Sequence, residues 1–229
     1  MSAPSLRARV RAEMTEEIKA SARRRLAVDG ANLSLRGVAR DMGIVASALY
    51  RYFPSRDDLL TVLIMEAYQA LGDAAAAAEA QIPAHESRRR WLAVCSAVRA
   101  WAAAHPAEYG LLYGSPVPGY DAPKDTVTPA AAVVLLLAQI AEAAADTLAP
   151  IPAPTPLPAP VRADFRILIE QQASELPEEV LDRVFVGWTQ LFGLVNFEIF
   201  GRLDGTIEAR TEYFDYHMNL MADLVGLPS

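Results

Sequence analysis

The segment 35–53, LRGVARDMGIVASALYRYF, constrains the fold more than any other part of the chain. Four of its apolar residues recur at positions i, i+3, i+4 and i+7 and so share one face of a short helix: Leu35, Val38, Ala39 and Met42. Ser34 stands where it can cap this helix, and Gly43 stands where the helix should end. A second short helix is expected to follow, with three packed residues: Leu49, Tyr50 and Phe53.

Two short helices joined by a three- or four-residue turn that contains glycine form a helix-turn-helix. The second helix of such a unit lies in the DNA major groove, with its N-terminal residues against the base edges. The residues expected to face outward here are Ala46, Ser47, Ala48 and Arg51. Helix, glycine turn and helix also occur in many all-α proteins that never bind DNA, so the motif alone leaves both interpretations open.

The distribution of charge favours the DNA-binding interpretation. The whole chain has a net charge of −7. Residues 1–60, however, hold 11 Lys and Arg against 7 Asp and Glu, whereas the remaining residues hold 10 against 21. A basic N-terminal part on an acidic body is typical of a protein that binds nucleic acid at one end only.

Residues 1–13 are expected to form a mobile basic arm. Its arginines can reach phosphates or a minor groove, but they fit a solvated tail equally well: Arg7, Arg9 and Arg11. A helix should begin at Thr15 and pack on the helix-turn-helix through three residues spaced by four: Ile18, Ala22 and Leu26. The arginines at 23–25 then lie mostly outside, which is more typical of a solvated face than of a DNA contact.

The rest of the chain predicts an all-α protein, because apolar residues recur with helical spacing and no alternating strand pattern is visible. Helices are expected over residues 55–82, 86–104, 129–148, 161–173, 177–200 and 207–225. The arginines at 88–90 are interpreted as a solvated face rather than as a nucleic-acid patch. Residues 149–160, APIPAPTPLPAP, predict an extended polyproline spacer, with a PxxP docking ligand as the alternative.

The helix predicted over residues 177–200 is apolar almost all the way round, so it must be buried on two sides. One side can pack within its own domain, whereas the other needs a partner. Gly187 and Gly193 would allow a close helix approach there. A homodimer held by helices 177–200 and 207–225 and their symmetry mates satisfies this requirement.

The text of two segments resembles a known family. Residues 15–60 resemble the DNA-binding domain of the TetR family of transcriptional repressors, through Gly43, Leu49, Tyr50, Phe53, Ser55 and Leu59. Tyr52 replaces the usual His, Arg56 the usual Lys, and Val45 the Ser that caps the recognition helix. GWTQLFGLVNFEIFG resembles the C-terminal WHG domain of a subset of this family, with Trp188 and Gly193 matching and Phe192 in place of His.

The resemblance implies a helix-turn-helix domain over residues 1–60 and a ligand-binding and dimerisation domain over residues 61–229. It further implies a homodimeric, cytoplasmic repressor that a small-molecule effector releases from a palindromic operator. Phosphate positioning falls to Ser34, Tyr50, Tyr52 and Arg56. Base-edge reading falls to Arg36, Ala46, Ser47, Ala48 and Arg51. The ring of Tyr50 is expected to be packed, with its hydroxyl on a phosphate.

The effector cavity is expected among the helices of the larger domain. Its candidate liners are polar or amphipathic side chains within apolar runs: Trp101, Tyr109, Trp188 and Asn196. Ordinary core packing is the alternative for each of them.

Two other classes of function receive less support. Three scattered histidines, one cysteine (Cys95) and no nucleophile elbow or phosphate loop argue against an enzyme, and no cofactor or metal site is expected. A helical carrier of lipids or small molecules without specific DNA binding is the alternative to a regulator. No membrane association is expected, because the longest apolar run, 129–141, is too short to span a bilayer.

Overall fold

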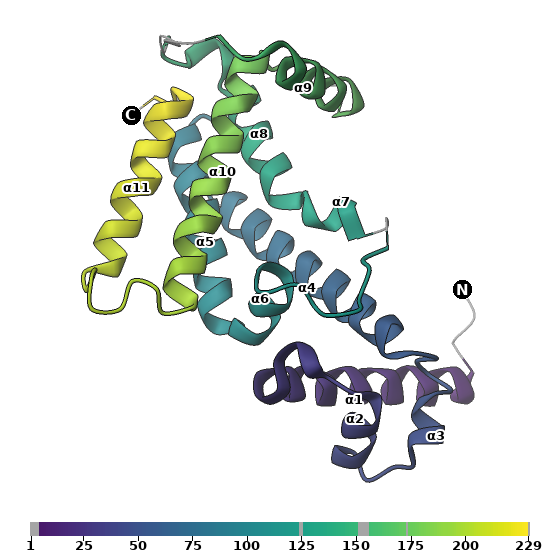
Figure 1. The fold of residues 1–229 in the computed structure, drawn as a ribbon. Coiled ribbons are helices and arrows are strands. Elements are labelled where there is room, and N and C mark those ends of the chain that lie inside the picture. The colour runs from purple at the N-terminus through teal and green to yellow at the C-terminus, as the bar shows by residue number, and fades with distance from the viewer. Residues whose placement is uncertain (1–4, 124–125, 151–155, 173, 229) are drawn as a thin grey trace. The chain divides into compact units, whose positions relative to one another are not determined.

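The computed structural model describes residues 5–123, 126–150, 156–172 and 174–228, and within these ranges every regular element is a helix (Figure 1). The all-α prediction is therefore confirmed. The elements are α1 (Leu6–Asp29), η1 (Gly30–Asn32), α2 (Leu35–Asp41), α3 (Ala46–Leu49), α4 (Arg56–Glu79), α5 (Ser87–Ala104), α6 (Pro106–Tyr113), α7 (Val127–Ala130), α8 (Ala132–Ala143), η3 (Ala145–Thr147), α9 (Ala159–Gln172), α10 (Glu178–Ile199) and α11 (Arg210–Val225).

These elements divide into two compact units. The first unit comprises Met1–Gln69 and His105–Pro129, and the second comprises Ala70–Ala104 and Ala130–Ser229. The domain boundary expected after residue 60 falls inside α4, whose first part belongs to the first unit and whose remainder belongs to the second.

The core of the first unit is built by α1, α2, α3 and the start of α4. Its buried apolar residues form one cluster: Ile18, Ala22, Leu26, Leu33, Leu35, Val38, Ala39, Leu49, Phe53, Leu59, Leu60 and Leu63. The predicted packing of α1 on the helix-turn-helix is thus confirmed, because all three of its residues spaced by four belong to this cluster.

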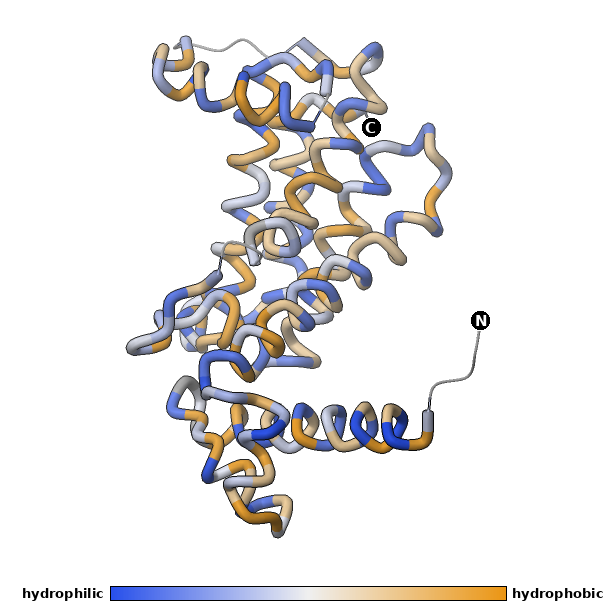
Figure 2. Tube along the Cα trace, turned by 90° about the vertical axis from the view of Figure 1, so that its right-hand side faces the viewer, coloured by the Kyte–Doolittle hydropathy of each residue, from blue (hydrophilic) through white to orange (hydrophobic). Residues whose placement is uncertain are grey.

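The mobile arm predicted over residues 1–13 is wrong for the described part of that range. Helix α1 begins at Leu6, and the Ser5 hydroxyl accepts a hydrogen bond from the Ala8 N–H at 3.3 Å. Apart from Val10, positions 6–14 hold only Leu, Arg, Ala, Glu and Met, which are strong helix formers, so a single cap suffices to start the helix here. Figure 2 shows α1 as one unbroken helical coil. Thr15 lies inside this helix, where its hydroxyl donates to the Arg11 carbonyl. Residues 1–4 lie outside the described residues.

Ion pairs join α1 to the first part of α4. Lys19 is only 6% exposed, and its Nζ lies 2.5 Å from Glu66 Oε1 and 2.6 Å from Glu16 Oε1. Arg23 pairs with the other oxygen of Glu66. Burial opposes the charge on Lys19, but the hydrogen bonds to Glu16 and Glu66 outweigh it and raise its pKa above 10.5. The lysine's contribution to stability is therefore fully present below pH 10.5 and is lost as the pH rises through the raised pKa.

Replacing Glu66 with Gln is expected to lower the free energy of unfolding by about 1–2 kcal/mol, because a nearly buried ammonium loses one of its two carboxylates. The partial exposure of Glu66 and the remaining Glu16 keep the loss below that of a fully buried pair. Urea denaturation at pH 7 measures it. The exposed Glu17 supplies the control, and an equal loss in Glu17→Gln would contradict the assignment.

The second unit is built around α10, which packs against α5, α8, α9 and α11. In Figure 1, α10 and α11 run side by side with α5 and α8 behind them. Gly187 of α10 lies against the buried Trp91 of α5, because a Cβ built there would come within 2.7 Å of the indole ring. The close approach predicted at Gly187 therefore occurs within the chain's own core. A Cβ built at Gly193 would have no atom within 4 Å, apart from its chain neighbours and the backbone of its own helix.

The solvated face predicted for the arginines at 88–90 is wrong for two of them. Arg88 donates to the Leu227 and Pro228 carbonyls at 3.1 and 3.2 Å and pairs with Asp223. Arg90 pairs with Glu79, and both of these side chains are largely buried. Arg89 alone is exposed. These partners of Arg88 lie 135–140 residues further along the chain, and Glu79 lies on another helix 11 residues before Arg90, so the run of arginines alone does not reveal these pairs.

Three helix predictions need correction. Helix α4 ends at Glu79 rather than at residue 82. The single helix expected over residues 129–148 is divided at Ala131 into α7 and α8 and ends in η3. Helix α11 begins at Arg210 rather than at residue 207. The remaining boundaries of α5, α9 and α10 agree with the predicted ones to within two residues. The centre of the predicted polyproline spacer, residues 151–155, lies outside the described residues.

By length and composition alone, α4 is long and apolar enough to be a candidate for a membrane-spanning helix. The prediction from the sequence rested only on the shorter apolar run at 129–141. In α4, the side chains of Leu59, Leu60 and Leu63 are buried in the core of the first unit, as in the core helices of globular proteins.

Cys95 of α5 is fully buried in the second unit, and burial raises the pKa of its thiol well above the ordinary value.

Candidate nucleic-acid interface

The turn between α2 and α3 forms as the sequence predicts. The Ser34 hydroxyl accepts a hydrogen bond from the Gly37 N–H at 3.2 Å and caps α2. Gly43 follows α2 with φ +66°, a left-handed conformation that favours glycine. The Ile44 N–H then donates to the Ala39 carbonyl at 3.0 Å, which closes the turn.

Helix α3 is short and carries no side-chain cap. It spans only Ala46–Leu49, and Val45 at its N-cap makes no side-chain hydrogen bond, as expected for a residue that has no acceptor. Leu49 and Phe53 anchor it in the core. Ser47 and Arg51 are exposed, whereas Ala46 and Ala48 are half-buried, so the predicted outward face is present mainly at Ser47 and Arg51.

The structure places the ring of Tyr50 differently from the prediction. The ring of Tyr50, expected to be packed beside Leu49 and Phe53, is 44% exposed. The helix gives way to a turn after Leu49, which moves Tyr50 away from the buried side. Tyr52 is half-buried, and the guanidinium of Arg11 lies 5.1 Å from the centre of its ring.

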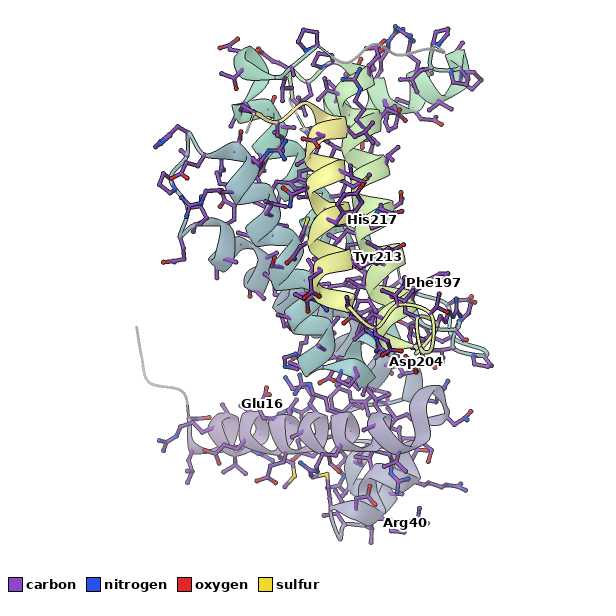
Figure 3. The ribbon with its side chains drawn as sticks, turned by 90° about the vertical axis from the view of Figure 1, so that its left-hand side faces the viewer. Glu16, Arg40, Phe197, Asp204, Tyr213 and His217 are labelled. Atoms are coloured by element: carbon purple, nitrogen blue, oxygen red, sulfur yellow. The ribbon has the colours of Figure 1, made fainter. Side chains whose placement is uncertain are left out.

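Other cations of the first unit also have partners within it. Arg56 Nε donates to the Leu33 carbonyl at 2.9 Å, which brings Arg56 next to the Ser34 cap. Arg25 makes a two-pronged hydrogen bond with the Asp41 carboxylate at 2.8 and 2.9 Å, so it ties α1 to the end of α2. Arg36 and Arg40 are exposed, and Figure 3 shows Arg40 and Glu16 on opposite sides of this unit.

The four candidate effector liners do not fall into one unit. Tyr109 is fully buried on α6 of the first unit, whereas Trp101, Trp188 and Asn196 belong to the second. The Trp188 ring contacts Phe185 and Phe192, with centroids 5.7 and 5.9 Å apart. The indole N–H of Trp188 and the side-chain oxygen of Asn196 are buried without a hydrogen-bond partner among the described residues.

Sequence reasoning missed a tyrosine cluster around Tyr109. Its ring centroid lies 5.1 Å from that of Tyr113, which in turn lies 6.0 Å from that of Tyr68 on α4. Burial raises the pKa of all three phenols. The only signal in the sequence was the helical spacing of positions 109 and 113. Among the described residues, no group of three His, Cys, Asp or Glu side chains is placed to hold a metal ion.

Comparisons with known proteins agree with the two segments recognised in the sequence. The family model described as "Bacterial regulatory proteins, tetR family" matches residues 18–63, and "Tetracyclin repressor-like, C-terminal domain" matches residues 91–221. HTH-type transcriptional regulators Rv1816 of Mycobacterium tuberculosis and Mb1846 of Mycobacterium bovis are each 36% identical to this chain over 206 residues. These alignments cover 84% of this chain and 85% of each relative.

Solved structures give the same result. The crystal structure of the regulatory protein SCO4313 is 30% identical and covers 96% of this chain and 100% of its own, with a TM-score of 0.78. A TetR family regulator from Marinobacter aquaeolei is 14% identical with a TM-score of 0.60, covers 93% of this chain and 97% of its own, and shares the fold.

Proposed function

The chain belongs to the TetR family of transcriptional regulators, and on this premise we propose that it is a homodimeric repressor that a small-molecule effector releases from a palindromic operator. The observation that carries the proposal is the helix-turn-helix of the first unit. It anchors α3 by Leu49 and Phe53 and leaves Arg36, Ser47 and Arg51 exposed. Such side chains suit phosphate and base-edge contacts.

Within this proposal, Arg36, Ser47 and Arg51 read base edges, whereas Ala46 and Ala48 can offer only apolar contact. Ser34, Tyr50, Tyr52 and Arg56 position phosphates. The exposure of Tyr50 supports its role, because its hydroxyl can reach a phosphate without unpacking the core. Arg56 also donates to the Leu33 carbonyl next to Ser34, so we expect it to stabilise the start of α2 in addition to contacting a phosphate.

The surface of α10 and α11 supports the proposal of a symmetric dimer. Large apolar side chains are exposed there: Val186, Phe197, Phe200 and Tyr216. Figure 3 shows Phe197, Tyr213 and His217 along these two helices. By contrast, Phe214, Met218 and Val225 of α11 are buried within the chain's own core, so they do not contribute to this surface. Burial of the exposed residues against a second copy would remove this surface from water.

The effector would occupy the interior near Trp188 and Asn196. Their buried, unpartnered donor and acceptor can be satisfied by a ligand that carries both an acceptor and a donor on an apolar frame. Release requires only that the ligand prefer the state that does not bind DNA, and a preference of about 1–3 kcal/mol changes operator affinity 5- to 150-fold.

Selection of bound sites from random duplex DNA tests this function. We expect two inverted half-sites whose centres lie about one helical turn, or a multiple of it, apart. Compounds are then screened for release of the selected DNA. Failure to enrich any sequence, together with weak binding that does not depend on salt, would instead support a helical carrier.

Arg36→Ala and Tyr50→Phe are expected to separate base reading from phosphate positioning. Arg36→Ala should cost about 1–3 kcal/mol on the selected operator and relax the preference at one position, because a base-edge contact is lost. Tyr50→Phe should weaken binding to operator and random DNA by the same factor, because a phosphate contact carries no sequence information. Fluorescence anisotropy with both DNAs measures these losses. An equal loss on both DNAs in Arg36→Ala would refute its role in base reading.

A further inference from the structure

A basic groove lies beside α3 in the first unit. It has a volume of about 810 Å³ and is lined by residues at the start of α1, Arg7 and Arg11 among them, together with Arg51 and Tyr52. The groove exists because α1 begins at Leu6, nine residues earlier than the sequence predicts.

Two contacts of Arg11 fix one wall of this groove. Its guanidinium donates to the Arg51 carbonyl at 3.2 Å and lies over the Tyr52 ring. A cation over an aromatic face and a hydrogen bond to the backbone together hold α1 against the residues that follow α3. The start of α1 is therefore positioned relative to the recognition helix.

The lining is cationic and amphipathic. Arg7 and Arg11 stand one helical turn apart on the same face of α1, and Arg51 also lines the groove. The lining residues named for this groove include no Asp or Glu. Leu6 and Val10, both more than half exposed, supply apolar surface beside the cations. The sugar–phosphate backbone of DNA has this same alternation of anionic phosphate and apolar deoxyribose.

We propose that this groove binds the sugar–phosphate backbone of DNA next to the bases that α3 contacts, and that Arg7 supplies its phosphate contact. The inference rests on the proposed function, since it extends the DNA surface of the same unit. Arg7 suits this role because it is exposed and makes no hydrogen bond or ion pair with the described residues, whereas Arg11 already holds Arg51 and Tyr52.

Arg7→Gln in the full-length protein tests the proposal, with the selected operator and random duplex DNA titrated from 50 to 300 mM salt. Each phosphate contact contributes about 0.9 to the slope of log affinity against log salt, so a dimer should lose about 2. Affinity at low salt should fall about tenfold for both DNAs alike. Thermal unfolding should not change, because Arg7 supports no other residue.

Arg9→Gln is the matched control, since Arg9 lies on the same turn of α1, carries the same charge and does not line the groove. It should alter the slope by less than half as much as Arg7→Gln. Equal slopes for the wild type and Arg7→Gln, or equal changes in the two variants, would overturn the proposal while leaving operator recognition intact. Absence of operator binding by the wild type would refute the proposed function itself.

Discussion

Phe197→Glu is expected to hold the protein as a monomer at micromolar concentration and to lower operator affinity more than about 100-fold. Phe197 is 47% exposed on α10, at the surface proposed to pair with a second copy. Burying a carboxylate in an interface costs several kcal/mol in desolvation even beside Arg202, whose guanidinium lies 5.5 Å from the centre of the Phe197 ring, and the symmetry of the dimer introduces two such carboxylates. A hundredfold loss corresponds to only about 2.7 kcal/mol, so this expectation is conservative. Sedimentation velocity and DNA anisotropy measure the two effects.

Ile167→Glu is the control for this experiment. Ile167 is 51% exposed on α9, outside the two helices proposed to form the interface, so the same change of residue type there should preserve both the dimer and the affinity. A dimeric Phe197→Glu variant would contradict the proposed interface. A monomeric variant with full operator affinity would contradict the need for a dimer.

Gly187→Val is expected to lower the free energy of unfolding by about 3 kcal/mol, the upper end of the usual cost of overpacking. A Cβ at this position would meet two ring atoms of Trp91 at 2.7 and 2.9 Å, and the fully buried Trp91 has little room to move. For a chain of this length, such a loss corresponds to a fall in Tm of about 6–12 °C. Thermal and urea denaturation followed by circular dichroism measure it.

Two further variants identify the cause. Gly193→Ala should be neutral or stabilising by about 0.5–1 kcal/mol, because the added methyl meets no atom of the chain and alanine favours the helix. In a Trp91→Phe background the smaller ring should reduce the cost of Gly187→Val by at least about 1 kcal/mol. An equal cost in both backgrounds would show that the loss does not arise from this contact.

The helix-turn-helix was predictable because its determinants are local. The spacing of Leu35, Val38 and Ala39, the cap at Ser34 and the turn at Gly43 all operate within four residues. The same locality explains one avoidable error. Ser5 and the helix formers after it predict a helix from local signals alone, whereas the density of arginines favours an arm, and the structure forms the helix.

Contacts between residues far apart in the sequence could not be predicted from such local patterns. Arg88 donates to carbonyls about 140 residues further along the chain. Gly187 leaves room for the Trp91 ring, which lies on another helix. At the candidate site, the exposure of Tyr50 depends on where α3 ends, and hydrophobic periodicity does not determine that point. The contact of Arg11 with Tyr52 likewise required the fold.

The burial of Cys95 has a practical consequence for measuring distances in this regulator. The thiolate is the reactive form of cysteine, and a fully buried thiol with a raised pKa does not react with labelling reagents while the protein is folded. The chain has no other cysteine. A single cysteine introduced at exposed Ser47 would therefore accept a spin label selectively in the otherwise natural sequence, and a dimer would then report the separation of its two recognition helices directly.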